Sequence, residues 1–85
     1  MLHESRISPA LRARITRLVA SGDSWNGHRR GVLFRFSLTR QPTLENHRIA
    51  YEAVYRRRRI RGVAGTVFDA IQEIECEIER RTNHP

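Results

Sequence analysis

Lysine is absent from this 85-residue sequence, so all sixteen side chains with a permanent positive charge are arginines. A guanidinium is a planar fork that binds phosphate or carboxylate through two parallel hydrogen bonds, whereas an ammonium acts as a point charge. Exclusive use of arginine therefore points to a phosphate-bearing or acidic partner. A GC-rich genome, which favours arginine codons, is the alternative explanation for the missing lysines.

Cysteine and long apolar runs are also scarce. The single cysteine, Cys76, excludes an internal disulfide and indicates a reducing compartment. Residues 1–9 lack the apolar segment of a signal peptide, and no stretch approaches the roughly eighteen apolar residues of a membrane span. We therefore expect a cytoplasmic protein with no membrane partner.

The sequence lacks a catalytic signature as well. Its histidines, at positions 3, 28, 47 and 84, match no metal-ligand spacing. Gly62 and Gly65 fit no nucleotide-binding fingerprint. Cys76 lies among glutamates, which disfavour its thiolate form. We expect no enzymatic activity, no metal and no cofactor.

The chain is strongly basic, and its charge is unevenly distributed. The net charge is +7, which attracts polyanions before any specific contact forms. Residues 1–65 carry fourteen arginines and four acidic residues, whereas residues 66–85 carry two arginines and five acidic residues. Attraction between the basic and acidic parts, within one chain or between two, is one route to a homodimer.

Apolar residues at helical spacing predict a first helix from about Pro9 to Ser21. Ser8 before the proline is typical of an N-cap, and Gly22 is typical of a C-terminal cap. Arg14 and Arg17 lie off the apolar stripe and share one face of this helix. They either extend a basic surface or form an ordinary solvated helix face.

Three strands are expected after this helix. Residues 23–31 predict a loop, because Asn26-Gly27 is a strong turn signal. Alternation from Val32 to Thr39 predicts a half-buried strand, and residues rich in β-branched and aromatic side chains predict a second from Arg48 to Tyr55.

The third strand is expected from about Arg59 to Ala64. Its turn is built from arginines, with no Gly or Asn to accept positive φ. One long strand bent near Arg57 is therefore the alternative.

A second helix is expected from about Val67 to Arg81. Thr66 is a typical N-cap, and Asp69 occupies the capping-box position. The glutamates at positions 73, 75, 77 and 79 lie off its apolar stripe. The chain is thus expected to form one α+β domain, residues 1–85, in the order α-β-β-β-α. Both helices pack on one face of an antiparallel sheet, and residues 1–7 and 82–85 are flexible.

This order is similar in layout to the double-stranded RNA-binding domain, and the resemblance covers most of the chain. That family grips phosphates with lysines at the start of its last helix, where this sequence reads Thr66-Val67-Phe68-Asp69. The Gly-Pro and His loop of the family has no clear equivalent in residues 41–47. The resemblance is therefore one of layout, and membership of the family is not predicted.

The strongest functional candidate is the run of residues 56–61, in which five of six side chains are arginine. A strand projects alternate side chains to opposite faces, whereas a turn fans them out; both arrangements present guanidiniums to phosphates. The alternatives are pairing with the glutamates between positions 73 and 79, or a solvated edge that blocks unwanted strand pairing.

Aromatic residues form a second group of candidates. Trp25 lies near His28, Arg29 and Arg30, and it either stacks on bases, anchors a protein partner or folds back over the end of the sheet. Tyr51 and Tyr55 share a strand face with Ile49, so we interpret them as core or core rim.

We expect a non-enzymatic module that contacts nucleic-acid phosphates, of DNA or RNA. The alternative is an accessory or inhibitor protein of the bacteriophage type, which binds an acidic or nucleic-acid-binding surface of a host protein. Small size and basic character indicate this alternative, and no motif carries it. The residues assigned to either partner are Arg14, Arg17, Trp25, Arg29, Arg30, Arg56, Arg57, Arg58, Arg59 and Arg61.

Overall fold

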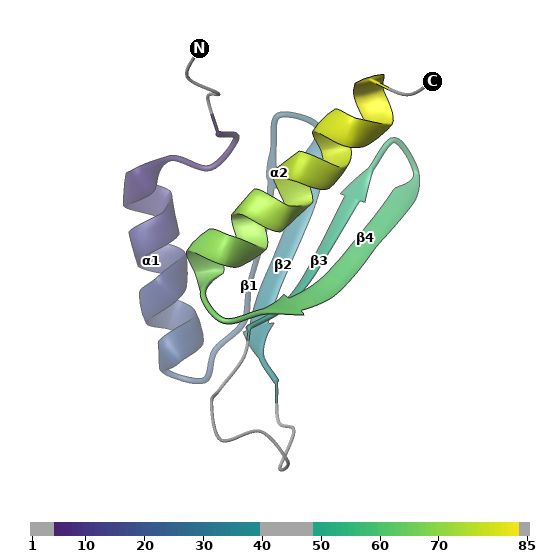
Figure 1. The fold of residues 1–85 in the computed structure, drawn as a ribbon. Helices are drawn as coiled ribbons and strands as arrows, with labels where there is room; N and C mark the ends of the chain where they lie inside the picture. Colours follow the sequence, from purple (N-terminus) through teal and green to yellow (C-terminus); the bar gives the residue numbers. More distant parts are fainter. Residues whose placement is uncertain (1–4, 40–48, 84–85) are drawn as a thin grey trace.

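The computed structural model describes residues 5–39 and 49–83. These residues contain a helix, four strands and a second helix, in the order α1 (Pro9–Ala20), β1 (Trp25–Arg29), β2 (Val32–Leu38), β3 (Ile49–Tyr55), β4 (Arg58–Ala64) and α2 (Val67–Asn83) (Figure 1). The strands form one antiparallel sheet in the order β1-β2-β3-β4, so β1 and β4 are its edges.

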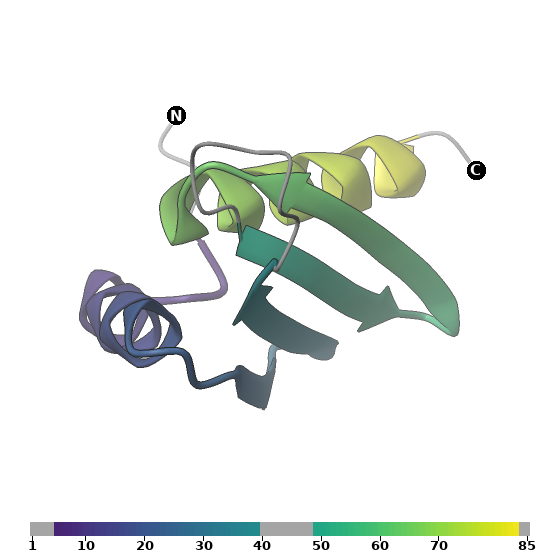
Figure 2. The ribbon, with the colours of Figure 1, turned by 90° about the horizontal axis from the view of Figure 1, so that it is seen from below.

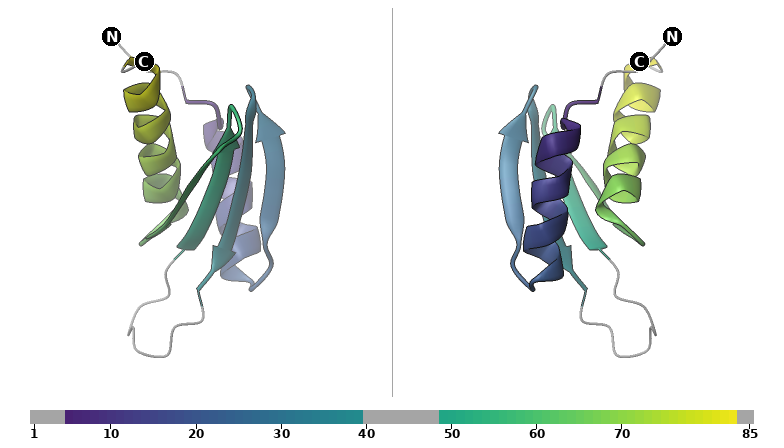
Figure 3. Two further views of the ribbon diagram at one scale, coloured as in Figure 1. Left: turned by 90° about the vertical axis from the view of Figure 1, so that its right-hand side faces the viewer. Right: turned by 90° about the vertical axis from the view of Figure 1, so that its left-hand side faces the viewer.

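Both helices pack on the same face of the twisted sheet (Figure 2). Helix α1 contacts β1 and β2, whereas α2 contacts β3 and β4 (Figure 3). Within the described residues no helix covers the other face, which we call the open face. The α+β class and the packing of both helices on one side are therefore confirmed.

The expected number of strands is wrong, because residues 23–31 contain strand β1 rather than a loop. The turn falls at Arg30-Gly31, and Asn26-Gly27 lies within the strand. Gly27 is needed there because the Trp25 ring lies over it: a Cβ at position 27 would come within 2.6 Å of that ring. The fourth strand also separates this fold from the layout of the double-stranded RNA-binding domain.

The third expected strand is present as β4, and a tight turn rather than a bend precedes it. Tyr55 pairs with Arg58, which leaves Arg56 and Arg57 as a two-residue loop. Their φ angles are 50° and 66°. The arginine turn therefore adopts positive φ without a glycine or asparagine.

Local caps fix the helix ends where the sequence places them. Ser8 Oγ accepts a hydrogen bond from Leu11 N at 3.2 Å, and Thr66 Oγ1 accepts one from Asp69 N at 3.0 Å. After α1, Gly22 has a φ of 91°, and its N–H donates to the Val19 carbonyl at 3.0 Å. A left-handed glycine with this hydrogen bond is a Schellman-type end, which stops the helix.

The core lies between the sheet and the two helices. Alternation along β2 buries Val32, Phe34 and Phe36 against the apolar stripes of α1 and α2. Trp25 packs beside them, with its ring centre 6.2 Å from that of Phe36. Trp25 and the two tyrosines, Tyr51 and Tyr55, are partly buried against this core. This agrees with the interpretation of the tyrosines as core rim and of the tryptophan as a cover for the sheet end.

Glu75 differs from the expectation, because it is only 6% exposed although the pattern placed it off the apolar stripe. Its Oε1 accepts hydrogen bonds from Ser5 Oγ at 3.1 Å and from the Arg6 backbone N–H at 2.6 Å. Ile7 is buried in the core beside this contact. The segment before α1, whose residues 1–4 lie outside the described residues, is thus anchored to α2 from Ser5 onward.

Gly62 generates a stability prediction. It pairs with Tyr51, and a Cβ at position 62 would collide with the Tyr51 hydroxyl and ring. We predict that Gly62→Ala lowers the free energy of unfolding by about 1–3 kcal/mol, because overpacking displaces neighbouring groups. Urea denaturation measures the change.

Gly65→Ala is the matched control, because a Cβ at position 65 would meet nothing within 4 Å. Its free energy of unfolding should stay within about 0.5 kcal/mol of the parent value. Equal losses in the two variants would show that the Tyr51 contact is not the cause.

Candidate functional site

Two arginine-containing turns lie at the same end of the sheet. The β1–β2 turn is Arg30-Gly31, and the β3–β4 turn is Arg56-Arg57. They are neighbours, because Val32, which begins β2, pairs with Tyr55, which ends β3 (Figure 1). We call this region the arginine end; it comprises Arg29, Arg30, Arg56, Arg57 and Arg58.

The backbone of these turns is strained by the presence of arginine. Both central residues of each turn have positive φ, with Arg30 at 48°, Arg56 at 50° and Arg57 at 66°. Such turns favour Asn-Gly, because a left-handed residue with a Cβ costs roughly 1–2 kcal/mol. Backbone strain of this kind persists where the surrounding structure imposes it, and it clusters at active sites and binding sites.

Aromatic rings hold several arginines of this region in place. The Arg56 guanidinium lies 5.1 Å from the centre of the Tyr55 ring, and Arg6 lies 5.8 Å from the same ring. Arg29 lies 5.8 Å from the Trp25 ring. Contacts within about 6 Å contribute roughly 0.5–1 kcal/mol at exposed positions. Trp25 and Tyr55 thus position guanidiniums in this structure.

The open face carries a second group of arginines. Alternation along the strands places Arg35, Arg59 and Arg61 on this face around Glu52. Arg35 Nη1 lies 3.9 Å from Glu52 Oε1, and the Nε atoms of Arg59 and Arg61 lie 3.8 and 3.7 Å from Oε2. These distances exceed the roughly 2.7–2.9 Å of a charge-assisted hydrogen bond. The carboxylate therefore attracts three guanidiniums without binding any of them tightly.

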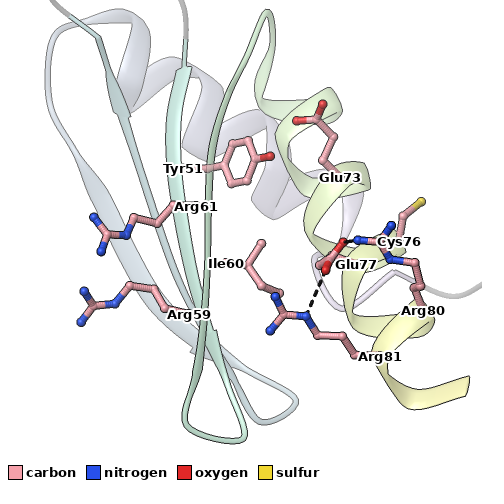
Figure 4. A pocket seen from close by; sticks show the side chains of 9 residues that line it. All are labelled: Tyr51, Arg59, Ile60, Arg61, Glu73, Cys76, Glu77, Arg80 and Arg81. Carbon is pink, nitrogen blue, oxygen red and sulfur yellow. Dashed lines mark hydrogen bonds and ion pairs between the residues drawn. The ribbon is translucent and has the colours of Figure 1, made fainter. Parts of the chain in front are cut away.

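The glutamates of α2 lie on the helix-covered side of the sheet, away from the guanidiniums of Arg59 and Arg61 (Figure 4). A cavity of about 510 Å³ lies between β4 and α2, and Arg59 and Arg61 are among the residues that line it. The guanidiniums of these two arginines point away from α2 (Figure 4). Glu77 bonds to Arg80 and Arg81 of its own helix, with Arg81 Nε at 3.0 Å. The hydrogen bond from Arg81 is the main reason that the pKa of Glu77 is lowered. Among the described residues no ion pair joins the run at 56–61 to these glutamates.

Tyr51 lines the same cavity. Burial, followed by interaction with Glu73, raises the pKa of the Tyr51 phenol to about 12. The phenol is thus a neutral group at physiological pH. It belongs to the packing around Gly62 rather than to an acid–base site.

The structure separates the residues that the sequence assigned to the site. Arg29, Arg30 and Arg56 to Arg58 meet at the arginine end, whereas Arg59 and Arg61 lie on the open face. Arg14 and Arg17 are exposed on α1, in the helix layer on the opposite side of the sheet. These two arginines are not brought together with the others.

Sequence reasoning missed the pairing of Arg35 with Glu52. Alternation with the buried Val32, Phe34 and Phe36 indicates that Arg35 is on the outward face of β2. Its neighbour on β3, however, follows from the strand register, in which Arg35 lies opposite Glu52 and Glu52 lies opposite Arg61. That register joins residues far apart in the chain, so no local signal reveals it.

Comparisons with protein-family models, curated proteins and solved structures found no match for the chain. In the part of the chain that the structure describes, no three His, Cys, Asp or Glu residues gather to hold a metal ion. Nor is any described helix long and apolar enough to cross a membrane. Function is therefore inferred from the arginine end and the open face themselves.

The strained turn generates a prediction about stability. Replacing Arg56 and Arg57 by Asn and Gly should raise the free energy of unfolding by about 1–2 kcal/mol, because both residues accept positive φ. Urea denaturation tests this. The control, Arg56→Gln with Arg57→Gln, removes the same charges but keeps both Cβ atoms, and should gain much less. Equal gains would assign the effect to charge repulsion instead of backbone strain.

Proposed function

We propose that this protein is a non-enzymatic module that binds nucleic acid through its phosphates, with the arginine end as the primary contact. One observation carries the proposal: Arg56 and Arg57 hold a left-handed backbone in a turn where Asn-Gly is more stable. A protein that retains two guanidiniums at the expense of stability has a use for them outside its own fold.

The chemistry of the arginine end fits phosphate. A guanidinium fork matches two phosphate oxygens, and a tight turn fans neighbouring forks outward. The adjacent turn adds Arg29 and Arg30 to the same end of the sheet. Contacts of this kind position a nucleic acid without reading its sequence.

The expected signature is strong dependence of affinity on salt. If about five arginines each neutralise one phosphate of a duplex, the log of the association constant falls with log salt at a slope of about −4 to −5. The bacteriophage-type alternative is binding to an acidic surface of a host protein. Such binding does not release the condensed counterions of a duplex, so its association constant should depend less steeply on salt.

Fluorescence anisotropy of a short labelled duplex tests the proposal. The variant with Arg56→Asn and Arg57→Gly should bind about tenfold more weakly and lose about 2 from the magnitude of the salt slope. The control is Arg14→Ala with Arg17→Ala, which removes the same charge from the helix layer. It should weaken binding about two- to threefold, through net charge alone.

Two results would overturn the proposal. Absence of binding to duplex or single strands at low salt would leave the host-protein alternative as the better account. Equal losses in the turn variant and the helix variant would mean that overall charge, and not the arginine end, attracts the nucleic acid.

A further inference from the structure

The open face carries a cluster of charged side chains that is separate from the arginine end. One row across the sheet runs Arg35–Glu52–Arg61, from β2 through β3 to β4. Arg59, on the same face of β4, also reaches Glu52, at 3.8 Å. Three guanidiniums thus share one carboxylate, which leaves a surplus of two positive charges.

These arginines remain available to a ligand. The side chains of Arg35, Arg59 and Arg61 are 61%, 58% and 66% exposed, whereas that of Glu52 is 25% exposed. Each guanidinium has five N–H donors, and none is within hydrogen-bond distance of Glu52. The carboxylate therefore holds the guanidiniums over the sheet while their donors still face solvent.

The remaining side chains narrow the class of ligand. Leu33, Val54 and the 43%-exposed Val63 also lie on this face. The phenylalanine, tyrosine and tryptophan side chains of the described strands lie on the helix-covered face, by the same alternation. Single-strand binders depend on aromatic stacking, for which this face offers only the imidazole of His28, opposite Leu33. A second copy of the face would bring like charges together.

Duplex nucleic acid meets these constraints, because it presents phosphates without exposing base faces. Arg35 on β2 and Arg61 on β4 are two strands apart, which is about 10 Å at the usual strand spacing. Phosphates follow one another along each strand of a duplex at about 3.4 Å of axial rise. The three guanidiniums, which lie 3.7–3.9 Å from Glu52, form one compact cluster between these strands that suits neighbouring phosphates of one backbone.

We infer that the open face is a second phosphate-binding surface, specific for duplex nucleic acid, and that Glu52 limits its affinity by competing for Arg35, Arg59 and Arg61. The inference rests on the proposed function. The two surfaces adjoin where the Arg56-Arg57 turn leads into β4, because Arg59 is on the open face whereas Arg58, opposite Tyr55, is on the helix-covered face. A duplex lying across both is held firmly at the end and more loosely at the face.

Substitution of Glu52 tests the inference directly. Glu52→Gln should tighten binding of a short labelled duplex about three- to fivefold, because an anion that competes with phosphate for the three arginines is removed. A single strand of equal length should gain less than about twofold. Glu79→Gln is the matched control, because it makes the same charge change at an exposed position on α2, on the other side of the sheet. It should alter affinity by less than about twofold.

A double-mutant cycle identifies the arginines through which Glu52 acts. Arg35→Ala with Arg61→Ala should weaken duplex binding about tenfold, because two phosphate contacts are lost. Adding Glu52→Gln to this variant should give a much smaller gain than in the parent protein. The far-ultraviolet circular dichroism and the urea midpoint of each variant establish that the exposed substitutions leave the fold intact.

The outcomes separate this inference from the proposed function. Equal affinities for Glu52→Gln and Glu79→Gln would overturn the inference, as would an equal gain for the single strand. No loss in the Arg35/Arg61 variant, alongside a loss in the Arg56/Arg57 variant, would also overturn it while leaving the proposed function standing. Failure of the parent protein and of Glu52→Gln to bind any nucleic acid at low salt would overturn both.

Discussion

The alternation of side chains along the strands of one four-stranded sheet determines which residues face the helices and which lie on the open face. Both helices pack on the same face, so the aromatic side chains of the strands are drawn to that side, from Trp25 on β1 to Tyr55 on β3. The arginines at positions 35, 59 and 61 are left on the other. Burial of the core thus produces, as its direct consequence, an open face of guanidiniums without a phenylalanine, tyrosine or tryptophan beside them. The same geometry turns Arg59 and Arg61 away from the acidic residues of α2 (Figure 4).

Stability and the proposed binding of phosphate compete at the arginine end. A chain of this size buries a small core, which supports a modest net stability. It nevertheless places two arginines in left-handed backbone at the β3–β4 turn, where substitutions that relieve strain are simple. Elsewhere the described residues make stabilising contacts at helix ends and before α1. Ser8 and Thr66 cap their helices, Gly22 ends α1, and Glu75 holds the segment before α1. The strained turn is therefore an exception within the described part of the chain, and this exception is the reason for proposing a function there.

Much of the fold follows from local sequence signals, and the remainder depends on contacts between distant residues. The caps and apolar spacing predicted both helices, and alternation predicted β2 and β3, because these patterns lie within single elements. Strand β1 was missed because Asn26-Gly27 is a turn signal in isolation; only the Trp25 ring lying over Gly27 explains a glycine within a strand. The arginine run was evident from the sequence. Its division between the arginine end and the open face, and the cluster around Glu52, required the register of β2, β3 and β4.

The most direct measurement is an NMR titration that follows the Nε–Hε signals of the arginines while a short duplex is added at low salt. The account predicts that signals of the arginine end and of Arg35, Arg59 and Arg61 shift together and saturate, whereas those of Arg14 and Arg17 on α1 move little. It also predicts that the shifts reverse as salt is added, because bound counterions replace the protein on the phosphates. Shifts of equal size on both sides of the sheet, or shifts confined to the helix layer, would contradict the claim that the sheet and its arginine turns form the binding surface.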